Sequence, residues 1–429
     1  TYANKIVDHF GADTLRVISE ESGRLKEIEG IGKLRAKSIK EAWEEQKTVR
    51  EVMMFLQTYG VTDALCLRLV RKYGNSAKTI LETEPYRIIR EVKGIGFKTA
   101  DKIALNLGLA SNGPARIDAG ILHTLQESED EGHTHAERRE LALKAADLLE
   151  ADTKDVENRI DALMLEEELV TSKPDWLQNP VCARAEETIV RCLHNQSKAD
   201  SSLPPIQVEK AIEWAQEKAG FAFADQQAEA VRQALQSKIS ILTGGPGTGK
   251  TTILRALVSI LRAKKTKILL AAPTGRAARR MAESCSHFAQ TVHRLLKFDP
   301  SQGGFTQNEQ NPLICDFVIM DEASMLDLRL AAALIRSLQP KAHLLLVGDA
   351  DQLPSVGSGN VLKDLIQCEL FQVTRLAVTF RQAENSGIVG LAHGILAGKG
   401  SPPPPVDSLN EINPQHDVHF VRALTPEDC

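Results

Sequence analysis

The sequence lacks the features that mark several large classes of protein. No run of about 18 uninterrupted apolar residues occurs, so neither a membrane span nor a membrane partner is expected. The seven cysteines include no C-x-x-C pair, which favours reduced thiols in a cytoplasmic protein. The formal net charge of -5 gives no overall attraction to nucleic acid, so any DNA site has to be a local basic patch. The 429 residues are 42% hydrophobic and 25% charged, which is ordinary for a globular chain of about three domains.

A glycine-rich loop near the middle of the chain lies between a predicted strand and a predicted helix. In ISILTGGPGTGKTT, residues 239–252, an apolar run is followed by a glycine-rich turn. The apolar residues after it recur at the spacing typical of a helix. Glycines let backbone N–H groups surround phosphate oxygens, and the helix N-terminus adds partial positive charge. We therefore expect a site for ATP and Mg²⁺, in which Lys250 reaches the β- and γ-phosphates and the Thr251 hydroxyl binds the metal. The predicted nucleotide-binding residues of the loop are Gly245, Pro246, Gly247, Thr248, Gly249, Lys250, Thr251 and Thr252. The alternative, a glycine turn with a chance lysine, leaves the flanking strand and helix unexplained.

Acidic and amide side chains follow two further predicted strands. Asp321 and Glu322 come directly after the apolar run FVIM, and α/β sheets bind ligands at the carboxyl ends of their strands. Asp321 suits Mg²⁺ coordination, and Glu322 suits orienting and deprotonating the attacking water. Gln352 follows the apolar run LLLV and can hydrogen-bond the γ-phosphate or that water. Arg381 follows a later apolar run and is a candidate arginine finger, although alone it would be a surface charge.

Two segments between the phosphate loop and Asp321 are candidates for contact with DNA. After the strand expected at residues 268–272, PTGRAARRM predicts a small-residue turn with three arginines, which is typical of an edge that binds a nucleic-acid backbone. Further on, KFDPSQGGFTQ at residues 297–307 predicts a strand-separating hairpin with Gly303-Gly304 as its two-residue turn. A plain surface loop is the alternative for this second segment.

The first hundred residues contain an internal repeat. Residues 6–39 and 69–103 share an aromatic residue followed by glycine, and later a Gly-Ile-Gly turn before a helix that carries basic residues. In such a turn the backbone N–H groups face outward and no side chain keeps a phosphate away. The basic residues that we expect to contact the DNA backbone are Lys33, Arg35 and Lys98. The alternative is that Gly-Ile-Gly only caps a helix, and the second copy with matching flanks favours DNA binding.

Six motifs occur in a fixed order: GGPGTGKTT, APTGRAARRM, TVHRLL, DEASM, GDADQLPSVGSG and FRQ. Together they resemble superfamily 1 DNA helicases of the RecD type, and the tandem hairpins resemble the stand-alone subfamily with a long N-terminal helix-hairpin-helix extension. The resemblance implies ATP-dependent 5′-to-3′ translocation on single-stranded DNA and duplex unwinding in recombination or repair, by a monomer without an obligatory protein partner. It assigns Gln227 to adenine, Gln352 to coupling and Arg381 to the γ-phosphate. The positions that it assigns to the DNA strand are Thr274, Arg276, Thr291 and His293.

The expected fold is an α/β RecA-like P-loop motor domain preceded by an all-α helix-hairpin-helix region. We expect four divisions: tandem hairpins at 1–110, a helical winged-helix-like linker domain at 111–205, a RecA-like ATPase domain at 206–381 with a hairpin insertion near 297–311, and the start of an incomplete second RecA-like domain at 382–429, where residues 418–421 form a candidate strand. Because the family continues into a complete second domain, we expect this sequence to be a piece of a longer protein.

Two other functions remain open at this point. The chain could be a DNA-binding adaptor whose nucleotide loop serves only as a conformational switch, although such a switch has no need for a carboxylate placed like Glu322. It could also be the helicase subunit of an exodeoxyribonuclease V-type complex. No carboxylate cluster typical of a nuclease occurs in the sequence, and the hairpin extension favours a stand-alone protein.

Overall fold

The computed structural model describes residues 2–59, 61–301 and 303–377, together with 391, 394–395, 398, 405–406, 418 and 420–421. The chain divides into two compact units, the first made of residues 1–126 and 137–169 and the second of residues 127–136 and 170–429. Arg381 and most of the expected fourth division lie outside the described residues. Of the strand expected at 418–421, Phe420–Val421 forms β13, which pairs in parallel with β12 (Pro405–Val406).

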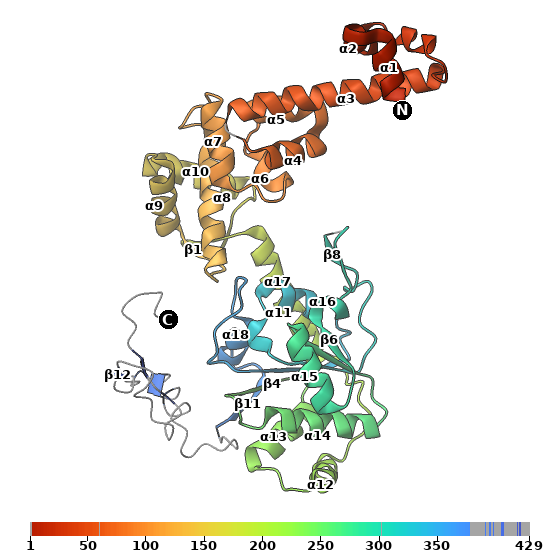
Figure 1. Cartoon of the computed structure of the whole chain (residues 1–429). Helices are drawn as coiled ribbons and strands as arrows, with labels where there is room; N and C mark the ends of the chain where they lie inside the picture. Colours follow the sequence, from red (N-terminus) through yellow and green to blue (C-terminus); the bar gives the residue numbers. More distant parts are fainter. Residues whose placement is uncertain are drawn as a thin grey trace. The chain divides into compact units, whose positions relative to one another are not determined.

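The first unit consists mainly of helices (Figure 1), and two of its apolar clusters belong to the sequence repeat. One cluster comes from residues 6–36 and the other from residues 52–103, so each copy of the sequence repeat has its own core. This agrees with the all-α region expected from the sequence. The elements are α1 (Tyr2–Phe10), η1 (Gly11–Asp13), α2 (Thr14–Glu20), η2 (Ser22–Glu27), α3 (Lys33–Thr58), α4 (Asp63–Tyr73), η3 (Gly74–Ser76), α5 (Ala77–Thr83), α6 (Arg87–Glu91), α7 (Phe97–Asn106), α8 (Pro114–Asp130), α9 (Arg138–Leu149) and α10 (Thr153–Leu165).

A buried ion pair joins α7 to α8 within the first unit. The Arg116 guanidinium donates to both carboxylate oxygens of Asp101, at 2.8 and 3.0 Å, and its other nitrogen donates to the Ser111 and Leu149 carbonyls, each at 2.8 Å. The Tyr86 hydroxyl donates to the same carboxylate at 2.6 Å. Because every polar atom named here has a partner, these hydrogen bonds offset much of the cost of removing the two charges from water.

The linker region divides differently from the expected boundary at residue 205. Its elements follow the order of a winged helix along the chain, with β1 (Ala136–Glu137), α9, α10, β2 (Val170–Lys173) and β3 (Trp176–Gln178) after α8. However, β2, β3 and α11 (Pro180–Lys198) all belong to the second unit. The apolar side chains of α11, including Ile189 and Leu193, join the core of that unit. The spacing of these residues in the sequence shows that one face is apolar, but not which domain covers it.

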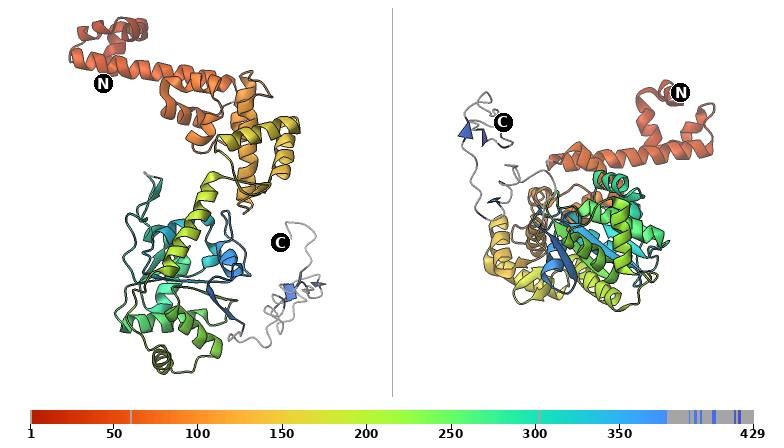
Figure 2. Two further views of the ribbon diagram at one scale, coloured as in Figure 1. Left: turned by 180° about the vertical axis from the view of Figure 1, so that it is seen from behind. Right: turned by 90° about the horizontal axis from the view of Figure 1, so that it is seen from below.

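The second unit is built on a six-stranded sheet in which every pairing is parallel. Its order is β11-β4-β10-β9-β5-β6. A parallel sheet needs helices on both faces, and Figures 1 and 2 show helices on either side of the strands. The strands are β4 (Ile239–Gly244), β5 (Ile268–Ala272), β6 (Ala289–Thr291), β9 (Phe317–Met320), β10 (His343–Gly348) and β11 (Gln372–Leu376). The remaining elements are α12 (Val208–Ala219), α13 (Asp225–Gln236), α14 (Lys250–Ala263), α15 (Gly275–Cys285), α16 (Val292–Leu295), β7 (Phe298–Asp299), β8 (Gly304–Phe305), η4 (Ala323–Met325), α17 (Leu328–Arg336) and α18 (Val361–Gln367).

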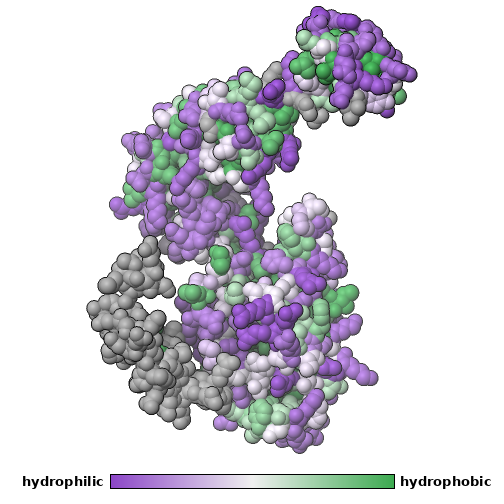
Figure 3. Space-filling view, viewed as in Figure 1, coloured by the Kyte–Doolittle hydropathy of each residue, from purple (hydrophilic) through white to green (hydrophobic). Residues whose placement is uncertain are grey.

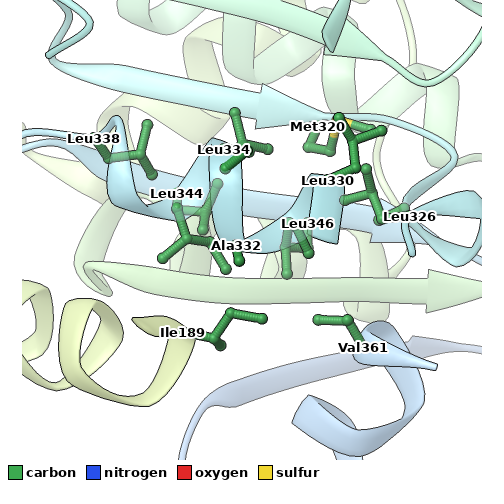
Figure 4. Packing of buried hydrophobic residues seen from close by; sticks show 14 of the residues in the cluster. Ile189, Met320, Leu326, Leu330, Ala332, Leu334, Leu338, Leu344, Leu346 and Val361 are labelled. Atoms are coloured by element: carbon green, nitrogen blue, oxygen red, sulfur yellow. The ribbon is translucent and has the colours of Figure 1, made fainter. Parts of the chain in front are cut away.

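Alternate residues of the central strand serve two separate cores. Leu344 and Leu346 of β10 join the cluster that includes α11, α17 and α18, which Figure 4 shows from close by. Leu345 and Val347 join the cluster that includes α12 to α15. This alternation follows from the two-residue period of a strand, and it fixes the register of the sheet because a shift by one residue would exchange the two sets.

The surface shown in Figure 3 is mostly hydrophilic, as expected for a chain in which 25% of the residues are charged. Hydrophilic residues cover much of the face shown in Figure 3, and apolar residues are scattered among them. Within the described ranges, no helix has both the length and the apolar character needed to cross a bilayer.

Candidate nucleotide and DNA sites

A cavity of about 900 Å³ opens beside the glycine-rich loop at the carboxyl ends of the strands. The loop follows β4 and ends where α14 begins, so the predicted order of strand, loop and helix is present. The cavity also receives side chains that follow β5, β9 and β10. Its lining consists of Gly245, Pro246, Gly247, Thr248, Gly249, Lys250, Thr251, Thr252, Leu254, Ala277, Arg280, Met281, Glu283, Ser284, Asp321, Glu322 and Gln352.

The backbone of the loop has the form that phosphate binding requires. Gly247 and Gly249 have φ values of +82° and +90°, a region that favours glycine because it has no Cβ. Lys250 donates from its amine to the Gly244 carbonyl and, at 3.0 Å, to the Gly245 carbonyl, so it lies folded over the loop. The Thr248 hydroxyl donates to the same Gly245 carbonyl at 2.8 Å. A cationic side chain above glycine N–H groups at a helix N-terminus fits an anionic phosphate chain.

The two predicted carboxylates lie at the edge of this cavity. Asp321 is anchored by its backbone N–H, which donates to the Ala271 carbonyl of β5 at 2.9 Å, while the Glu322 N–H donates to Oδ1 of Asp321 at 3.0 Å. Burial raises the pKa of Asp321, and the positive charges of Lys250 and Arg280 oppose that rise. Oxygen ligands from Asp321 and Thr251 suit Mg²⁺.

Glu322 has a strained backbone. Its φ of +52° lies in the left-handed region, which costs on the order of 1 kcal/mol or more for a residue that is not glycine. This left-handed conformation turns the chain sharply after β9, and the Glu322 side chain lines the cavity. Gln352 also lines it, and its amide nitrogen donates to the buried Asp349 carboxylate at 3.2 Å. Strand ends therefore bring Lys250, Asp321, Glu322 and Gln352 together as the sequence predicted.

Two predicted nucleotide contacts remain, of which Gln227 is described by the structure and Arg381 is not. Gln227 is 5% exposed, and its amide oxygen accepts from the Ala224 N–H at 3.2 Å, so it caps the start of α13. It is not among the described side chains that line the cavity. Its assignment to adenine therefore stays a prediction from the resemblance. The assignment of Arg381 falls outside the described residues.

The basic segment after β5 is a helix and not a turn, which corrects the sequence interpretation. Gly275–Cys285 forms α15, and the Thr274 hydroxyl caps it by accepting from the Ala277 N–H at 3.2 Å. Arg276 is exposed near the start of the helix. Arg280 is also exposed, but it lines the nucleotide cavity, which the sequence interpretation missed. The spacing of Ala277, Arg280 and Ser284 along one helix face was the available signal.

The second candidate DNA edge combines a helix cap with an aromatic cluster. The Thr291 hydroxyl accepts from the Arg294 N–H at 3.3 Å and so begins α16. The exposed His293 ring lies 5.6 Å from the ring of Phe305 and 6.1 Å from that of Phe298. These two phenylalanines face each other across the β7–β8 pair, with ring centroids 5.3 Å apart. Exposed aromatic rings of this kind can stack on nucleic-acid bases.

The hairpin is present, but its predicted turn is wrong. Gly304 belongs to β8, so the connection runs from residue 300 to residue 303 and not through Gly303-Gly304 alone. The Asp299 carboxylate accepts from the Ser301 N–H at 2.9 Å and from the Ser301 hydroxyl at 2.6 Å. This Asx turn starts the connection earlier, because an aspartate side chain can replace a backbone acceptor.

Both copies of the Gly-Ile-Gly turn have the same backbone form. Gly30 and Gly94 have φ values of +91° and +85°, and each is followed by a buried isoleucine. The second glycine of each turn is an extended N-cap, of α3 in the first copy and of α7 in the second. The first N–H groups of these helices are therefore presented beside the turn. This geometry is that of a phosphate-binding hairpin as well as of a helix cap.

The predicted basic residues differ in how they are held. Lys33 and Lys98 are exposed at the first turn of their helices. Arg35 instead donates to the Gly30 carbonyl at 2.8 Å and stacks its guanidinium on the Tyr2 ring at 4.4 Å. In the second copy, Arg68 performs the corresponding task by donating to the Lys93 carbonyl at 3.0 Å, which the sequence did not indicate.

Comparisons with known proteins match both regions. Residues 45–135 match the family model of the ATP-dependent RecD2 DNA helicase HHH domain, and residues 227–358 match that of an AAA domain. The chain is 30% identical over 447 residues to the ATP-dependent RecD2 DNA helicase of Deinococcus radiodurans, which covers 99% of this chain and 60% of that protein. It is 38% identical over 201 residues to the RecBCD enzyme subunit RecD of Mycobacterium tuberculosis, over 41% of this chain and 35% of that protein. The chain thus spans less than two thirds of the length of each of these relatives. Among solved structures, the Pif1 helicase from Candida albicans is 22% identical to this chain, with a TM-score of 0.34. The match covers 41% of this chain and 44% of the Pif1 chain.

Proposed function

Because the chain belongs to the RecD-like DNA helicases, we propose that it hydrolyses ATP, moves along single-stranded DNA from 5′ to 3′ and unwinds duplex DNA in recombination or repair. The observation that carries the proposal is the single cavity in which Lys250, Asp321, Glu322 and Gln352 meet. They come from three strand ends, since Lys250 follows β4, Asp321 and Glu322 follow β9, and Gln352 follows β10. Each has a side chain suited to one part of phosphoryl transfer.

The roles follow from position and chemistry. Lys250 and the loop N–H groups hold the β- and γ-phosphates, and Thr251 with Asp321 provides oxygen ligands for Mg²⁺, whose charge would stabilise the phosphates during transfer. Glu322 orients the attacking water and accepts its proton. Gln352 links the cavity to the loop after β10, since it is hydrogen-bonded to Asp349. A change at the γ-phosphate can therefore move that loop.

DNA would be held by sequence-independent contacts. The Gly-Ile-Gly turns with Lys33, Arg35 and Lys98 are the proposed contacts of the first unit. In the motor, the proposed edge is formed by Thr274 and Arg276 of α15, by Thr291 and His293, and by the β7–β8 hairpin as strand-separating pin. We also propose that the protein acts as a cytoplasmic monomer.

The proposal is tested by ATP hydrolysis with and without single-stranded DNA. Lys250→Ala should lose nucleotide binding because the phosphate contact is removed. Glu322→Gln keeps the shape of the side chain but removes the base, so it should bind ATP and hydrolyse it at least about a hundredfold more slowly. Near-normal turnover by Glu322→Gln would overturn the assignment of the base. The alternative function, a DNA-binding adaptor with a nucleotide switch, would stay open only if the wild type itself fails to hydrolyse ATP.

A second candidate is favoured by one comparison. The motor region is similar to RecD subunits of RecBCD enzymes, so the chain could act within a larger helicase–nuclease. Residues 45–135, however, match a domain model named for RecD2 helicases. Light scattering of the purified protein, and pull-down of stable partners from its host, would distinguish a monomer from an obligatory subunit.

A further inference from the structure

The α15 helix turns one of its three arginines toward the nucleotide cavity. Ala277, Arg280 and Ser284 line the cavity together, as expected for residues three and four positions apart on one helix face. Arg276 and Arg279 are exposed and are not among the described lining residues. The segment that the sequence assigns to DNA therefore presents arginines in two directions.

Arg280 changes the net charge of the side chains that line the cavity. Its lining contains three carboxylates, on Asp321, Glu322 and Glu283, and two cationic side chains, on Lys250 and Arg280. Without Arg280 the lining would carry two more negative than positive charges. An ATP molecule has several negative charges of its own, and like charges in a partly enclosed site repel strongly. Arg280 and Mg²⁺ together would reverse the sign of the site.

The guanidinium is available for a ligand. Among the residues that the structure describes, no hydrogen bond or ion pair within 4.0 Å involves Arg280. Other arginines near α15 are engaged in holding it: Arg255 donates to the Ser284 carbonyl and Arg262 to the Ser286 carbonyl, each at 3.2 Å. Arg280 and Asp321 line the same cavity, so the guanidinium shares it with the carboxylate that is expected to bind Mg²⁺.

We propose that Arg280 binds the phosphates of the nucleotide, and that α15 thereby contacts ATP through one face while its N-terminal end serves the proposed DNA edge. The inference rests on the proposed nucleotide site and adds a residue to it. A guanidinium can donate two parallel hydrogen bonds to phosphate oxygens, which lysine cannot do. Arg280 is then a binding residue supplied by the same domain as the phosphate loop.

Equilibrium binding of a fluorescent ATP analogue with Mg²⁺, in the absence of DNA, tests the proposal. Arg280→Ala should weaken binding by roughly tenfold or more, as expected for the loss of a charge-assisted hydrogen bond. Arg280→Lys should lose less, because the charge remains. Arg279→Ala is the matched control, since it removes an exposed arginine from the same helix without touching the cavity. Its binding should equal that of the wild type.

Three outcomes would overturn the inference: wild-type affinity in Arg280→Ala, an equal loss in Arg279→Ala, or weaker DNA binding by Arg280→Ala with nucleotide binding unchanged. Thermal denaturation shows whether each variant is folded, and Arg280→Lys keeps the test valid if the alanine variant is unstable. Failure of the proposed function looks different. In that case the wild type binds the analogue, and Arg280→Ala weakens it, but no hydrolysis is stimulated by DNA.

Discussion

The structure predicts that Lys33 and Lys98 determine how steeply DNA binding of the first unit depends on salt. Each lysine is exposed at the first turn of the helix that follows a Gly-Ile-Gly turn. A contact between lysine and phosphate releases a condensed counterion, so log K falls with log salt by about 0.9 for each contact on duplex DNA. The double variant Lys33→Ala/Lys98→Ala should therefore flatten the slope by nearly two.

Arg35 is left out of this variant because it has a second role. Its hydrogen bond to the Gly30 carbonyl and its stacking on Tyr2 brace the turn itself. Replacing it would change the hairpin as well as the charge, and the two effects could not be separated. The lysines offer the cleaner measurement, since each lost contact should change the affinity ratio between about 50 and 200 mM salt roughly three- to fourfold.

Fluorescence anisotropy of a labelled duplex, titrated without nucleotide at several salt concentrations, gives the slope. The matched control is Lys78→Ala, because Lys78 lies on α5, outside the Gly-Ile-Gly turns and the helices that follow them, and pairs with Glu82 at 3.9 Å. This variant should retain the wild-type slope. A double variant with the wild-type slope would refute the reasoning and leave the Gly-Ile-Gly turns as helix caps that hold the helices together.

Three further perturbations have defined outcomes. Removing residues 300–303 should abolish strand displacement but spare ATPase stimulation by single-stranded DNA, and loss of both activities would count against a pin. Asp101→Ala should lower the free energy of unfolding by about 3–5 kcal/mol, measured by denaturant titration, because it leaves the buried Arg116 charge unpaired. Burial lowers the pKa of His343 to about 4. The unfolded state then takes up the proton first, so stability should fall by up to about 3 kcal/mol as pH drops from about 6.5 toward 4; His343→Gln should remove this loss, and equal acid sensitivity in both proteins would contradict the assignment.

The elements that the sequence predicted best are those with both a strong apolar run and a clear stop. The strands at 268–272 and 317–320 match β5 and β9. Each is buried by helices on both faces, so its side chains are apolar without interruption. Asp321 and Glu322 could be placed in the site from sequence alone, because carboxyl ends of parallel strands meet at one edge.

The predictions that failed depended on side chains that compete with the backbone or on distant partners. The threonine cap at Thr274 turned an expected loop into α15, and the Asp299 side chain shifted the turn of the hairpin. The predicted boundary at residue 205 differs from the division after residue 169, in part because α11 packs against α17, far along the chain. Local spacing shows an apolar face, but only the assembled sheet shows what covers it.

The position of β5 gives a physical reason for coupling between the proposed nucleotide and DNA sites. On one side, the Ala271 carbonyl of β5 accepts from the Asp321 N–H, and on the other side Ala272 is in register with Thr291 of β6. The strand therefore lies between a carboxylate of the nucleotide site and one of the proposed DNA residues. It continues directly into α15, which bears Thr274 at its start and Arg280 in the cavity. A shift of α15 by the length of one hydrogen bond would alter both, because a helix moves as a rigid element. Coupling then needs no separate relay, and it predicts that Arg280 variants also change how strongly DNA stimulates hydrolysis.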